Sequence, residues 1–399
     1  MVPAMANYDA IVVGSGPAGL AAACLLAEAG VRTAVIAPPP VTGDPRTVAL
    51  MRPSIGLLQA LGLWPDPLKP GCAPLRKLRI VDDTGGPLQA PDLNFSAQEL
   101  GESAFGWNVP LTLLIPALYN RATALGATMV TAEVMGMRVE HDHCVIMSGA
   151  GETTARVVLA ADGQNSRLRE AVGIKVTKWS YNQVAIATSF DHSAPHDDIS
   201  TEYHRSAGPF TVVPLPGNRS SIVWMERPGR ASELMALDDR HLAAEIQLAT
   251  HGSLGRIDAL GPRKTFPMRG ASAQAYAAGR VMLIGEAAHV VPPVGAQGLN
   301  MSLRDAAHAA ELVIDAVSAG GDPGSRAVMR DYQAARRIDV IPRQAIIDAM
   351  NRSLLSEFEV FGMIRALGLT AVAATPPLRK LVMRGGIAPA RGLPRSMRG

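Results

Sequence analysis

The chain has 399 residues, of which 48% are hydrophobic and 18% are charged. A chain of this composition can bury a large core, which excludes disorder throughout. Lysine and arginine exceed aspartate and glutamate by only three, 38 against 35, which argues against a nucleic-acid-binding protein. The three cysteines form no CxxC pair, so a zinc ribbon, a disulfide framework and a dithiol redox site are disfavoured, and reduced thiols in the cytoplasm fit best.

The N-terminal segment is apolar but has the features of a folded domain. Asp9 and three glycines interrupt its apolar run, and no basic residues precede it, which argues against a signal peptide. No stretch of the chain reaches about 18 uninterrupted apolar residues, so no transmembrane helix is expected.

A glycine-rich loop lies between a predicted strand (8–13) and a predicted helix that Pro17 begins and Gly30 ends, before a second strand (32–37). In a GxGxxG loop the first glycine permits a tight turn, the second lets the backbone approach a pyrophosphate, and the third lets the helix pack against the strand. Alone, such a loop can be a simple glycine-rich turn. Between a strand and a helix, it predicts dinucleotide binding. The loop consists of Gly14, Ser15, Gly16, Pro17, Ala18 and Gly19.

One element of a dinucleotide site is missing. An acidic residue is expected at the end of the second strand, where it accepts hydrogen bonds from the adenosine ribose. Ala37 stands there, and Asp44 lies beyond a proline run. We therefore expect the dinucleotide to be held more weakly or by other contacts.

Two later stretches each read as an apolar strand that ends in a polar turn. Residues 156–163 read RVVLAADG, and residues 280–289 read RVMLIGEAAH. A helical pattern follows the second stretch, because apolar residues recur there at spacings of three and four. That face consists of Leu299, Leu303, Ala306, Ala310, Val313 and Val317.

These three motifs together resemble those of the flavoprotein aromatic hydroxylases of the p-hydroxybenzoate hydroxylase type. GSGPAG is similar to their first dinucleotide motif, AADGQNSRLR to their DG motif, and GEAAHVVPPVGAQGLN to their GD motif. The order and separation also agree. Within that group the chain most resembles the ubiquinone-biosynthesis hydroxylases, through DPRTVALMRPSIGLLQALGLW, GPFTVVPLPGNRSSIVW and the C-terminal RALGLTAVAATPPLRKLVMRGGI. The fold implied is α/β, a Rossmann-like FAD-binding domain with an inserted β-sheet substrate domain and a C-terminal helical extension.

The resemblance implies a role for each matching residue. The loop 14–19 cradles the FAD pyrophosphate, Arg46 lies near the FAD, and Asp162 and Gly163 lie near the pyrophosphate and an NAD(P)H approach path. Gly285 and Glu286 reach the ribityl chain. The N-terminus of a helix stabilises negative charge such as that of a reduced flavin, and the amides implied to do so belong to Gly298, Leu299 and Asn300. The residues implied to line the site beside the flavin ring are Pro292, Pro293, Gly295 and Gln297.

Three positions depart from the family pattern. Glu286 stands where the family usually has aspartate, which keeps the acceptor but adds a methylene group. Leu111 stands at a ribityl position that is commonly polar, and Ala37 lacks the ribose acceptor. These departures lower the expected affinity for FAD and leave the fold unaffected.

The expected domains are discontinuous. The FAD-binding domain is predicted over 1–75, 105–180 and 268–330, and the substrate domain over 76–104 and 181–267. Strand-like segments in the latter are 182–192, 200–205, 210–215 and 220–226. Residues 331–399 are predicted to form the helical extension, kinked or broken at Pro342 and again at Pro376-Pro377.

Other polar residues carry weaker signals. His141 and His143 flank Asp142 in a predicted solvated turn, and the same interpretation applies to His192 and His196, so no metal site is expected. His289 is either a structural residue or a residue near the flavin. Cys24 is expected in the core. Arg167 and Arg169 are interpreted as a solvated turn, with a functional role left open. No GxSxG elbow is present, which leaves a serine hydrolase unsupported.

The resemblance implies an FAD-dependent monooxygenase that uses NAD(P)H and O₂ to hydroxylate the ring of a polyprenylated phenol. Because the cofactor carries the hard chemistry, no acid–base pair stands out and no catalytic side chain is nominated. Two alternatives stay open, namely a hydroxylase of a soluble aromatic acid and a flavin-free assembly subunit of a quinone-biosynthesis complex. The ring carbon that is hydroxylated stays undetermined.

The C-terminus concentrates positive charge. Seven basic residues and no acidic residue lie within 360–399. Interleaved basic and apolar residues favour contact with an anionic surface, so one interpretation is peripheral contact with the inner membrane or with a quinone-biosynthesis complex. The other is a docked helix with a solvated basic face. The basic residues are Arg365, Arg379, Lys380, Arg384, Arg391, Arg395 and Arg398.

Overall fold

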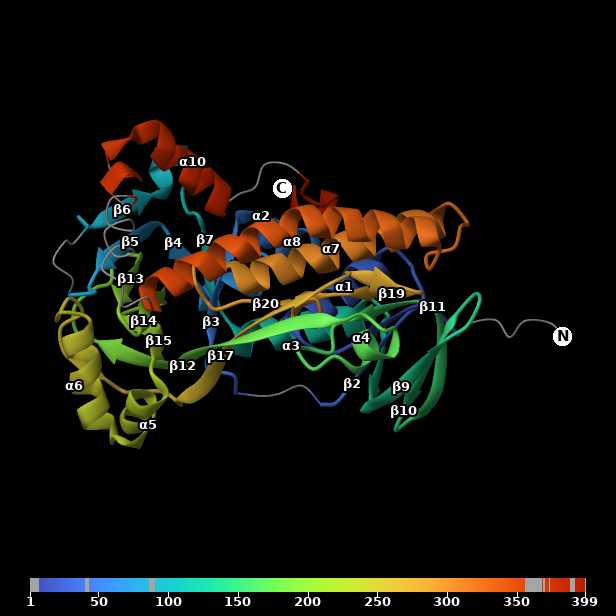
Figure 1. The fold of residues 1–399 in the computed structure, drawn as a ribbon, viewed down its shortest axis with the longest axis horizontal. Helices are drawn as coiled ribbons and strands as arrows, with labels where there is room; N and C mark the ends of the chain where they lie inside the picture. Colours follow the sequence, from blue (N-terminus) through green and yellow to red (C-terminus); the bar gives the residue numbers. More distant parts are fainter. Residues whose placement is uncertain are drawn as a thin grey trace.

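The computed structural model describes residues 7–39, 43–85, 90–355, 368, 370–372, 374–387 and 392–398. The molecule is elongated, with one sheet toward each end and long strands that connect them (Figure 1). The predicted α/β class is confirmed.

The N-terminal strand, helix and second strand are confirmed as β1 (Tyr8–Val13), α1 (Pro17–Glu28) and β2 (Thr33–Ala37). β1 lies between β2 and β11 (Gly151–Ala160) and runs parallel to both. Its side chains are almost entirely buried, as expected of a central parallel strand. The sheet order is β18-β19-β11-β1-β2-β8, and a hairpin of β9 and β10 extends from β11. The remaining bounds are β8 (Thr128–Thr131), β9 (Val134–Val139), β10 (Cys144–Ser148), β18 (Ala277–Ala278) and β19 (Val281–Leu283).

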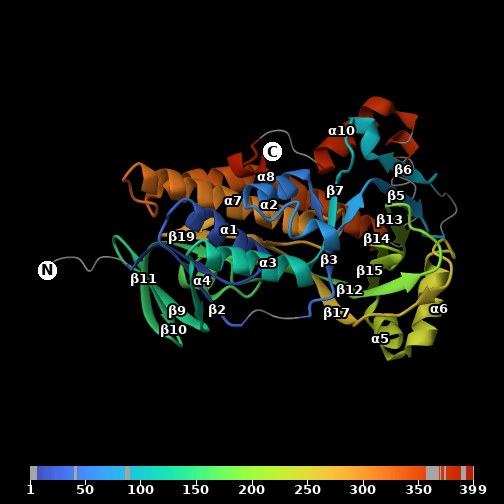
Figure 2. The same cartoon turned by 180° about the vertical axis from the view of Figure 1, so that it is seen from behind.

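Helices cover the sheet that contains β1, which is called the nucleotide sheet below because the predicted dinucleotide-binding loop follows β1. The apolar face predicted after the GD motif is confirmed within α7 (Gln297–Ser318). This helix packs against α1 and α8 (Arg326–Leu355). α3 (Leu111–Ala124) also packs on α1, and Figure 2 shows these two helices close together. Cys24 is buried in this core as predicted, and so are Cys72 and Cys144.

A second sheet forms the other end. Its order is β20-β17-β12-β15-β14-β13-β5-β6, with β16 beside β12, and all four predicted strand segments of this region are confirmed. Two helices pack on it, α5 (Pro228–Ala236) and α6 (Asp239–Ala249). The strand bounds are β5 (Lys77–Asp82), β6 (Leu93–Ser96), β12 (Val176–His192), β13 (Ile199–Arg205), β14 (Gly208–Leu215), β15 (Arg219–Glu226), β16 (Ile257–Asp258), β17 (Lys264–Ala273) and β20 (His289–Val290).

Smaller elements complete the chain. A three-stranded sheet of order β3-β7-β4 accompanies the two large ones. Its strands are β3 (Thr47–Met51), β7 (Gly106–Pro110) and β4 (Ala73–Leu75), and the short helices are α2 (Arg52–Ala60), α4 (Arg167–Ala171), η1 (Lys69–Gly71), η2 (Ala97–Leu100), η3 (Gly285–Ala287) and η4 (Arg395–Met397).

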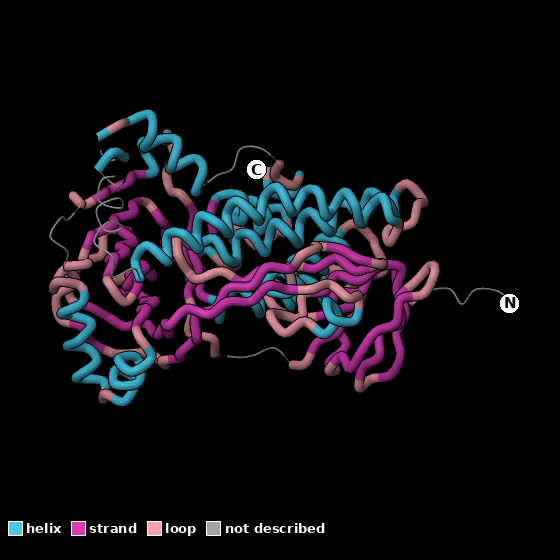
Figure 3. Tube along the Cα trace, in the orientation of Figure 1, coloured by secondary structure: helices cyan, strands magenta, loops and turns pink. Residues whose placement is uncertain are grey.

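β12 and β17 pair along most of their length and connect the two ends of the molecule (Figure 3). The expected domain boundaries at 180 and 268 fall inside these two strands, and the boundary at 331 falls inside α8. The division into domains therefore stays a proposal, and continuous strands cross it.

The predicted kink or break at Pro342 is wrong as a break, because α8 continues through it to Leu355. Pro342 lies on the exposed side of the helix, so water can satisfy the carbonyl that a proline leaves without a donor. The predicted break at the proline pair 376–377 is confirmed, because Thr375 is not helical and the pair begins a helix, α10 (Pro376–Ile387). No helix within the described ranges is both long enough and apolar enough to cross a membrane.

Candidate functional site

The loop from Gly14 to Gly19 joins β1 to α1, and its glycines differ in what surrounds them. A Cβ atom on Gly14, where φ is +114°, would overlap the carbonyl oxygen of Ala161, and one on Gly19 would overlap the carbonyl oxygen of Gly14. A Cβ on Gly16 would meet no atom within 4 Å. Gly14 and Gly19 are thus required by close packing, whereas Gly16 keeps space open in front of the α1 N-terminus. That space suits a pyrophosphate, since the free N–H groups of a helix N-terminus attract phosphate.

The DG motif follows β11, next to this loop. Ala161 donates its N–H to Val13 O at 2.8 Å, which places Asp162 and Gly163 beside Gly14. One carboxylate oxygen of Asp162 accepts the Leu168 N–H at 3.2 Å, while Oδ1 is buried without a partner among the described residues. A buried oxygen without a donor is costly, so this atom suits a hydroxyl or amide of a bound cofactor.

Arg169 is buried, so the interpretation of 167–169 as a solvated turn is wrong for this residue. Only 1% of it is exposed. Its guanidinium donates to Ala287 O at 2.8 Å and to Gln164 O at 3.1 Å, so it connects the DG motif to the GD motif. Arg167 is exposed as predicted and forms an ion pair with Glu133.

The GD motif forms η3 directly after β19. Gly285 has a positive φ of +62° and packs closely on Ser302 of α7, so this turn leans on the helix that follows it. The Glu286 side chain is exposed. Burial opposes the charge of Arg46, but Asp44 and, more weakly, Glu286 raise the pKa of Arg46, which indicates that Glu286 and Arg46 face the same region.

Asp44, the acidic residue nearest to the position of the missing ribose acceptor, is buried and pairs with Arg46. The Arg46 guanidinium donates to both oxygens of Asp44, at 2.6 to 3.1 Å, and lies over the Phe266 ring at 4.7 Å. Ala37 ends β2 as predicted, and Leu111 is packed in the core at the start of α3. Neither position therefore presents a polar side chain.

The first turn of α7 presents backbone amides, because the first N–H groups of a helix have no partner within it. Ala296 caps the helix in a left-handed conformation without a side-chain hydrogen bond. The Asn300 side chain accepts from Met51 N and Ser54 Oγ and donates to Ala49 O and Ala296 O, so it fixes this turn against β3 and α2. This anchoring role of the asparagine side chain was not predicted. Before the turn, Pro292 is buried, Pro293 and Gly295 are exposed, and Gln297 is half-buried.

The weakly signalled histidines differ in their surroundings. His141 and His143 lie in the polar turn between β9 and β10, as predicted. His192 is buried, contrary to the interpretation as solvated, because Ala194 O and Ser220 Oγ satisfy both ring nitrogens. His196 is partly buried and contacts Leu215 O. His289 is also buried and contacts Asp305 at 2.7 Å. Within the described part of the chain, no group of His, Cys, Asp and Glu has the arrangement of a metal site.

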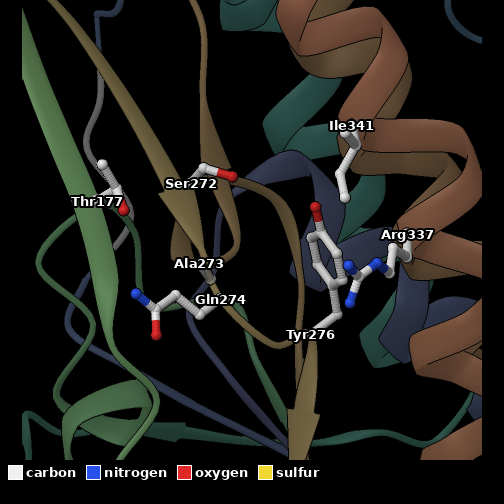
Figure 4. Close-up of a pocket in the computed structure, with 7 residues that line it drawn as sticks. All are labelled: Thr177, Ser272, Ala273, Gln274, Tyr276, Arg337 and Ile341. Atoms are coloured by element: carbon white, nitrogen blue, oxygen red, sulfur yellow. The ribbon is translucent and has the colours of Figure 1, made fainter.

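A cavity of about 240 Å³ lies between the β12–β17 pair and α8 (Figure 4). None of the residues that were predicted to contact FAD lines this cavity. Its lining residues are Thr177, Ser272, Ala273, Gln274, Tyr276, Arg337 and Ile341.

The comparisons with known proteins agree with the site. The model of a family described as an FAD binding domain matches residues 7–339. The crystal structure of p-nitrophenol 4-monooxygenase PnpA from Pseudomonas putida DLL-E4 superposes with a TM-score of 0.76, covering 95% of this chain and 97% of that one, at 19% identity. The chain belongs to the family whose model is described as an FAD binding domain, and the FAD-binding fold predicted from the sequence is confirmed.

Sequence relatives narrow the placement. The chain is 36% identical to ubiquinone hydroxylase UbiL of Rhodospirillum rubrum, over 94% of this chain and 88% of the relative. It is 29% identical to 3-demethoxyubiquinol 3-hydroxylase of Escherichia coli K12, over 94% and 96%. The chain therefore belongs to the ubiquinone-biosynthesis hydroxylases within that family, as the sequence motifs predicted.

Proposed function

We propose that the protein hydroxylates the aromatic ring of a polyprenylated phenol in ubiquinone biosynthesis, with FAD as cofactor, NAD(P)H as reductant and O₂ as the oxygen source. One observation carries the proposal: the three motif turns 14–19, 162–163 and 285–286 lie together at one edge of the nucleotide sheet, with open space at Gly16. The names of the relatives supply the substrate class.

The residues present fit FAD, because Gly16 leaves room and Asp162 Oδ1 has no donor among the residues that the structure describes. In this assignment the loop 14–19 and the α1 N-terminus hold the pyrophosphate. The remainder of the FAD molecule is surrounded by Arg46, Asp162, Gly163, Gly285 and Glu286. When bound, FAD supplies the redox chemistry by which electrons from NAD(P)H and oxygen from O₂ hydroxylate the ring. The amides of Gly298, Leu299 and Asn300 stabilise negative charge at the flavin ring. The aromatic ring of the substrate is oriented, and water is excluded from it, by Pro292, Pro293, Gly295 and Gln297.

The test of the proposed function has two steps. The purified full-length chain should show the visible absorption of bound FAD, and it should hydroxylate a prenylated phenol, with consumption of NAD(P)H and O₂ in equal amounts. A soluble aromatic acid serves as the comparison substrate. Turnover of the acid with no turnover of the prenylated phenol would contradict the substrate class. A colourless chain that binds no added FAD would contradict the proposal entirely and would favour the assembly-subunit alternative.

Glu286 can be tested directly as the ribityl contact. Glu286→Ala is expected to weaken FAD binding by at least about tenfold, since a hydrogen bond to a charged acceptor contributes about 1.5–3 kcal/mol. Glu286→Asp should retain most of the affinity because it retains the carboxylate. FAD titration of the apo-protein, followed by flavin fluorescence, gives both dissociation constants. Equal affinities for the two variants would place Glu286 away from the ribityl chain.

The C-terminal helix α10 supports a further part of the proposal, contact with an anionic membrane in which such a substrate resides. Arg379 is turned inward, where it pairs with Glu99 at 2.6 Å and lies over the Phe95 ring, and Met383 is buried beside it. The outer side of α10 is both apolar and basic. It presents Leu378, Lys380, Leu381, Val382 and Arg384, with Leu381 67% exposed.

Not all seven basic residues that motivated this idea contribute to such a surface. Arg379 and Arg395 are held by acidic residues, since Arg395 pairs with Asp315 at 2.6 Å. Arg398 donates to Leu393 O. Arg365 and Arg391 lie outside the described residues. Lys380 and Arg384 are therefore the residues to test.

We expect the double variant Lys380→Gln/Arg384→Gln to bind anionic vesicles about thirtyfold more weakly than the unmodified chain, because each basic residue near such a surface contributes about 1 kcal/mol. Co-sedimentation with phosphatidylserine-containing vesicles at low salt measures the affinity. Lys178→Gln/Arg240→Gln removes the same charge from exposed positions elsewhere and serves as the control. Equal loss in both double variants, or no binding by the unmodified chain, would contradict a contact through α10.

A further inference from the structure

Asp305 lies in the middle of α7 and is completely buried. Its carboxylate forms three hydrogen bonds, two with the GD motif turn and one with α8. Oδ2 accepts from the backbone N–H of Gly285 at 2.9 Å and lies 2.7 Å from Nε2 of His289, and Oδ1 accepts from Nε of Arg336 at 2.6 Å. Gly285 and His289 are the two ends of the GD motif turn, so one side chain holds both ends of that turn.

The Asp305 carboxylate is ionised in this position. Burial alone would raise its pKa, but the Arg336 guanidinium and His289 hold the pKa of Asp305 below its ordinary value. A buried carboxylate that loses its partners is strongly destabilised, and the same holds for an N–H that loses its acceptor. The turn and the carboxylate therefore stabilise each other's positions.

The charge network continues along the interface between α7 and α8. Arg336 also donates to Asp339 at 2.8 Å, and Asp339 accepts from Arg343 at 2.8 Å. Arg343 in turn donates to Oε1 of Gln297 at 3.3 Å, at the first residue of α7. The network thus begins at Gly285, in the Gly285–Glu286 turn, and ends at Gln297, in the first turn of α7 that also contains Gly298 and Asn300.

We propose that Asp305 is a positioning residue for FAD, which fixes the Gly285–Glu286 turn relative to the first turn of α7. These are the two segments that the proposed function places along the ribityl chain and the flavin ring, so the inference rests on that function. If the Gly285–Glu286 turn moved relative to the first turn of α7, one FAD molecule could no longer contact both segments at the same time. Asp305 itself touches no cofactor in this assignment and acts through Gly285 and His289.

Asp305→Asn is the first test. The asparagine amide keeps the volume but replaces one acceptor oxygen with an NH2 donor and removes the charge. It therefore loses either the contacts with Gly285 and His289 or the contact with Arg336, according to which side the NH2 group takes. We expect the dissociation constant for FAD to rise at least tenfold. The matched control is Asp322→Asn, because Asp322 also accepts from an arginine, Arg280 at 2.8 Å, and from a backbone N–H, Gly324 at 3.0 Å, but lies near the opposite end of β19. A residue with only a structural role would lower the melting temperature of the apo-protein and leave FAD affinity at the control value.

His289 provides a second measurement if Asp305→Asn fails to fold. His289→Gln keeps an N–H donor near the position of Nε2, whereas His289→Leu removes it. We expect His289→Leu to weaken FAD binding and His289→Gln to restore most of it. Wild-type FAD affinity in a folded Asp305→Asn variant, or equal wild-type affinity in the two His289 variants, would overturn the inference while the proposed function stands. Absence of FAD binding by the unmodified chain would overturn the proposed function first.

Discussion

Gly16→Val is expected to abolish FAD binding in a chain that still folds, with at least about a hundredfold loss of affinity. Gly16 has extended backbone angles, φ −72° and ψ 168°, which valine adopts readily. A Cβ there meets no protein atom within 4 Å, so the new side chain occupies only the space proposed for the pyrophosphate. The measurement is FAD titration of the apo-protein, together with its melting temperature.

Two other glycines make this result interpretable. Gly149→Val is the control, because a Cβ on Gly149 would also meet no atom within 4 Å, and this residue lies in a turn remote from the loop. It should bind FAD normally. Gly14→Val is a poor test, since its side chain would overlap the Ala161 carbonyl and disrupt the fold itself. Full FAD retention by folded Gly16→Val would show that the loop does not hold the pyrophosphate.

Arg169→Ala is expected to lower the free energy of unfolding by about 3 kcal/mol. The substitution leaves the carbonyl oxygens of Ala287 and Gln164 without their donor, and each unpaired buried group costs about 1–3 kcal/mol. For a chain of this size the melting temperature of the apo-protein should fall by roughly 4 °C.

Arg167→Ala supplies a control of the same residue type two positions away. The Arg167 side chain is 55% exposed, and surface ion pairs of this kind contribute about 0–1 kcal/mol. Its melting temperature should stay within about 2 °C of the unmodified chain. Similar melting temperatures for the two variants would mean that Arg169 does not hold the two motifs together.

The sequence predicts the motif turns well because their information is local. A Cβ atom on Gly19 would overlap the backbone of Gly14, only five residues earlier. Such a requirement fixes the spacing of the two glycines, and this spacing is visible in the sequence. The same holds for the period of α7 and for the strand-like segments of the second sheet. Ala37 is likewise placed correctly, because it is counted from the loop.

The errors concern residues whose surroundings come from distant parts of the chain. Arg167 and Arg169 look alike in the sequence, but Arg169 meets a carbonyl 118 residues away. His192 is buried because Ser220 on the neighbouring strand forms a hydrogen bond with its ring. Asp305 was not predicted, because the apolar face of α7 dominates the local pattern and nothing in the sequence distinguishes Asp305 from Asp315 of the same helix, which is exposed.

The strand order of the nucleotide sheet has a consequence for biosynthesis. β1 pairs with β11, and the turn at Gly14 is shaped by Ala161, which the ribosome adds 147 residues later. The turn at Gly285 is supported by Ser302 and Asp305, which are made later than Gly285 itself. At about 5–20 residues per second, the N-terminal loop waits roughly 7–30 s for its neighbour and longer for the second turn. The loop that opens the chain therefore gains its neighbour after about two fifths of the chain has been made, whereas the residues proposed to bind FAD are complete only after about three quarters.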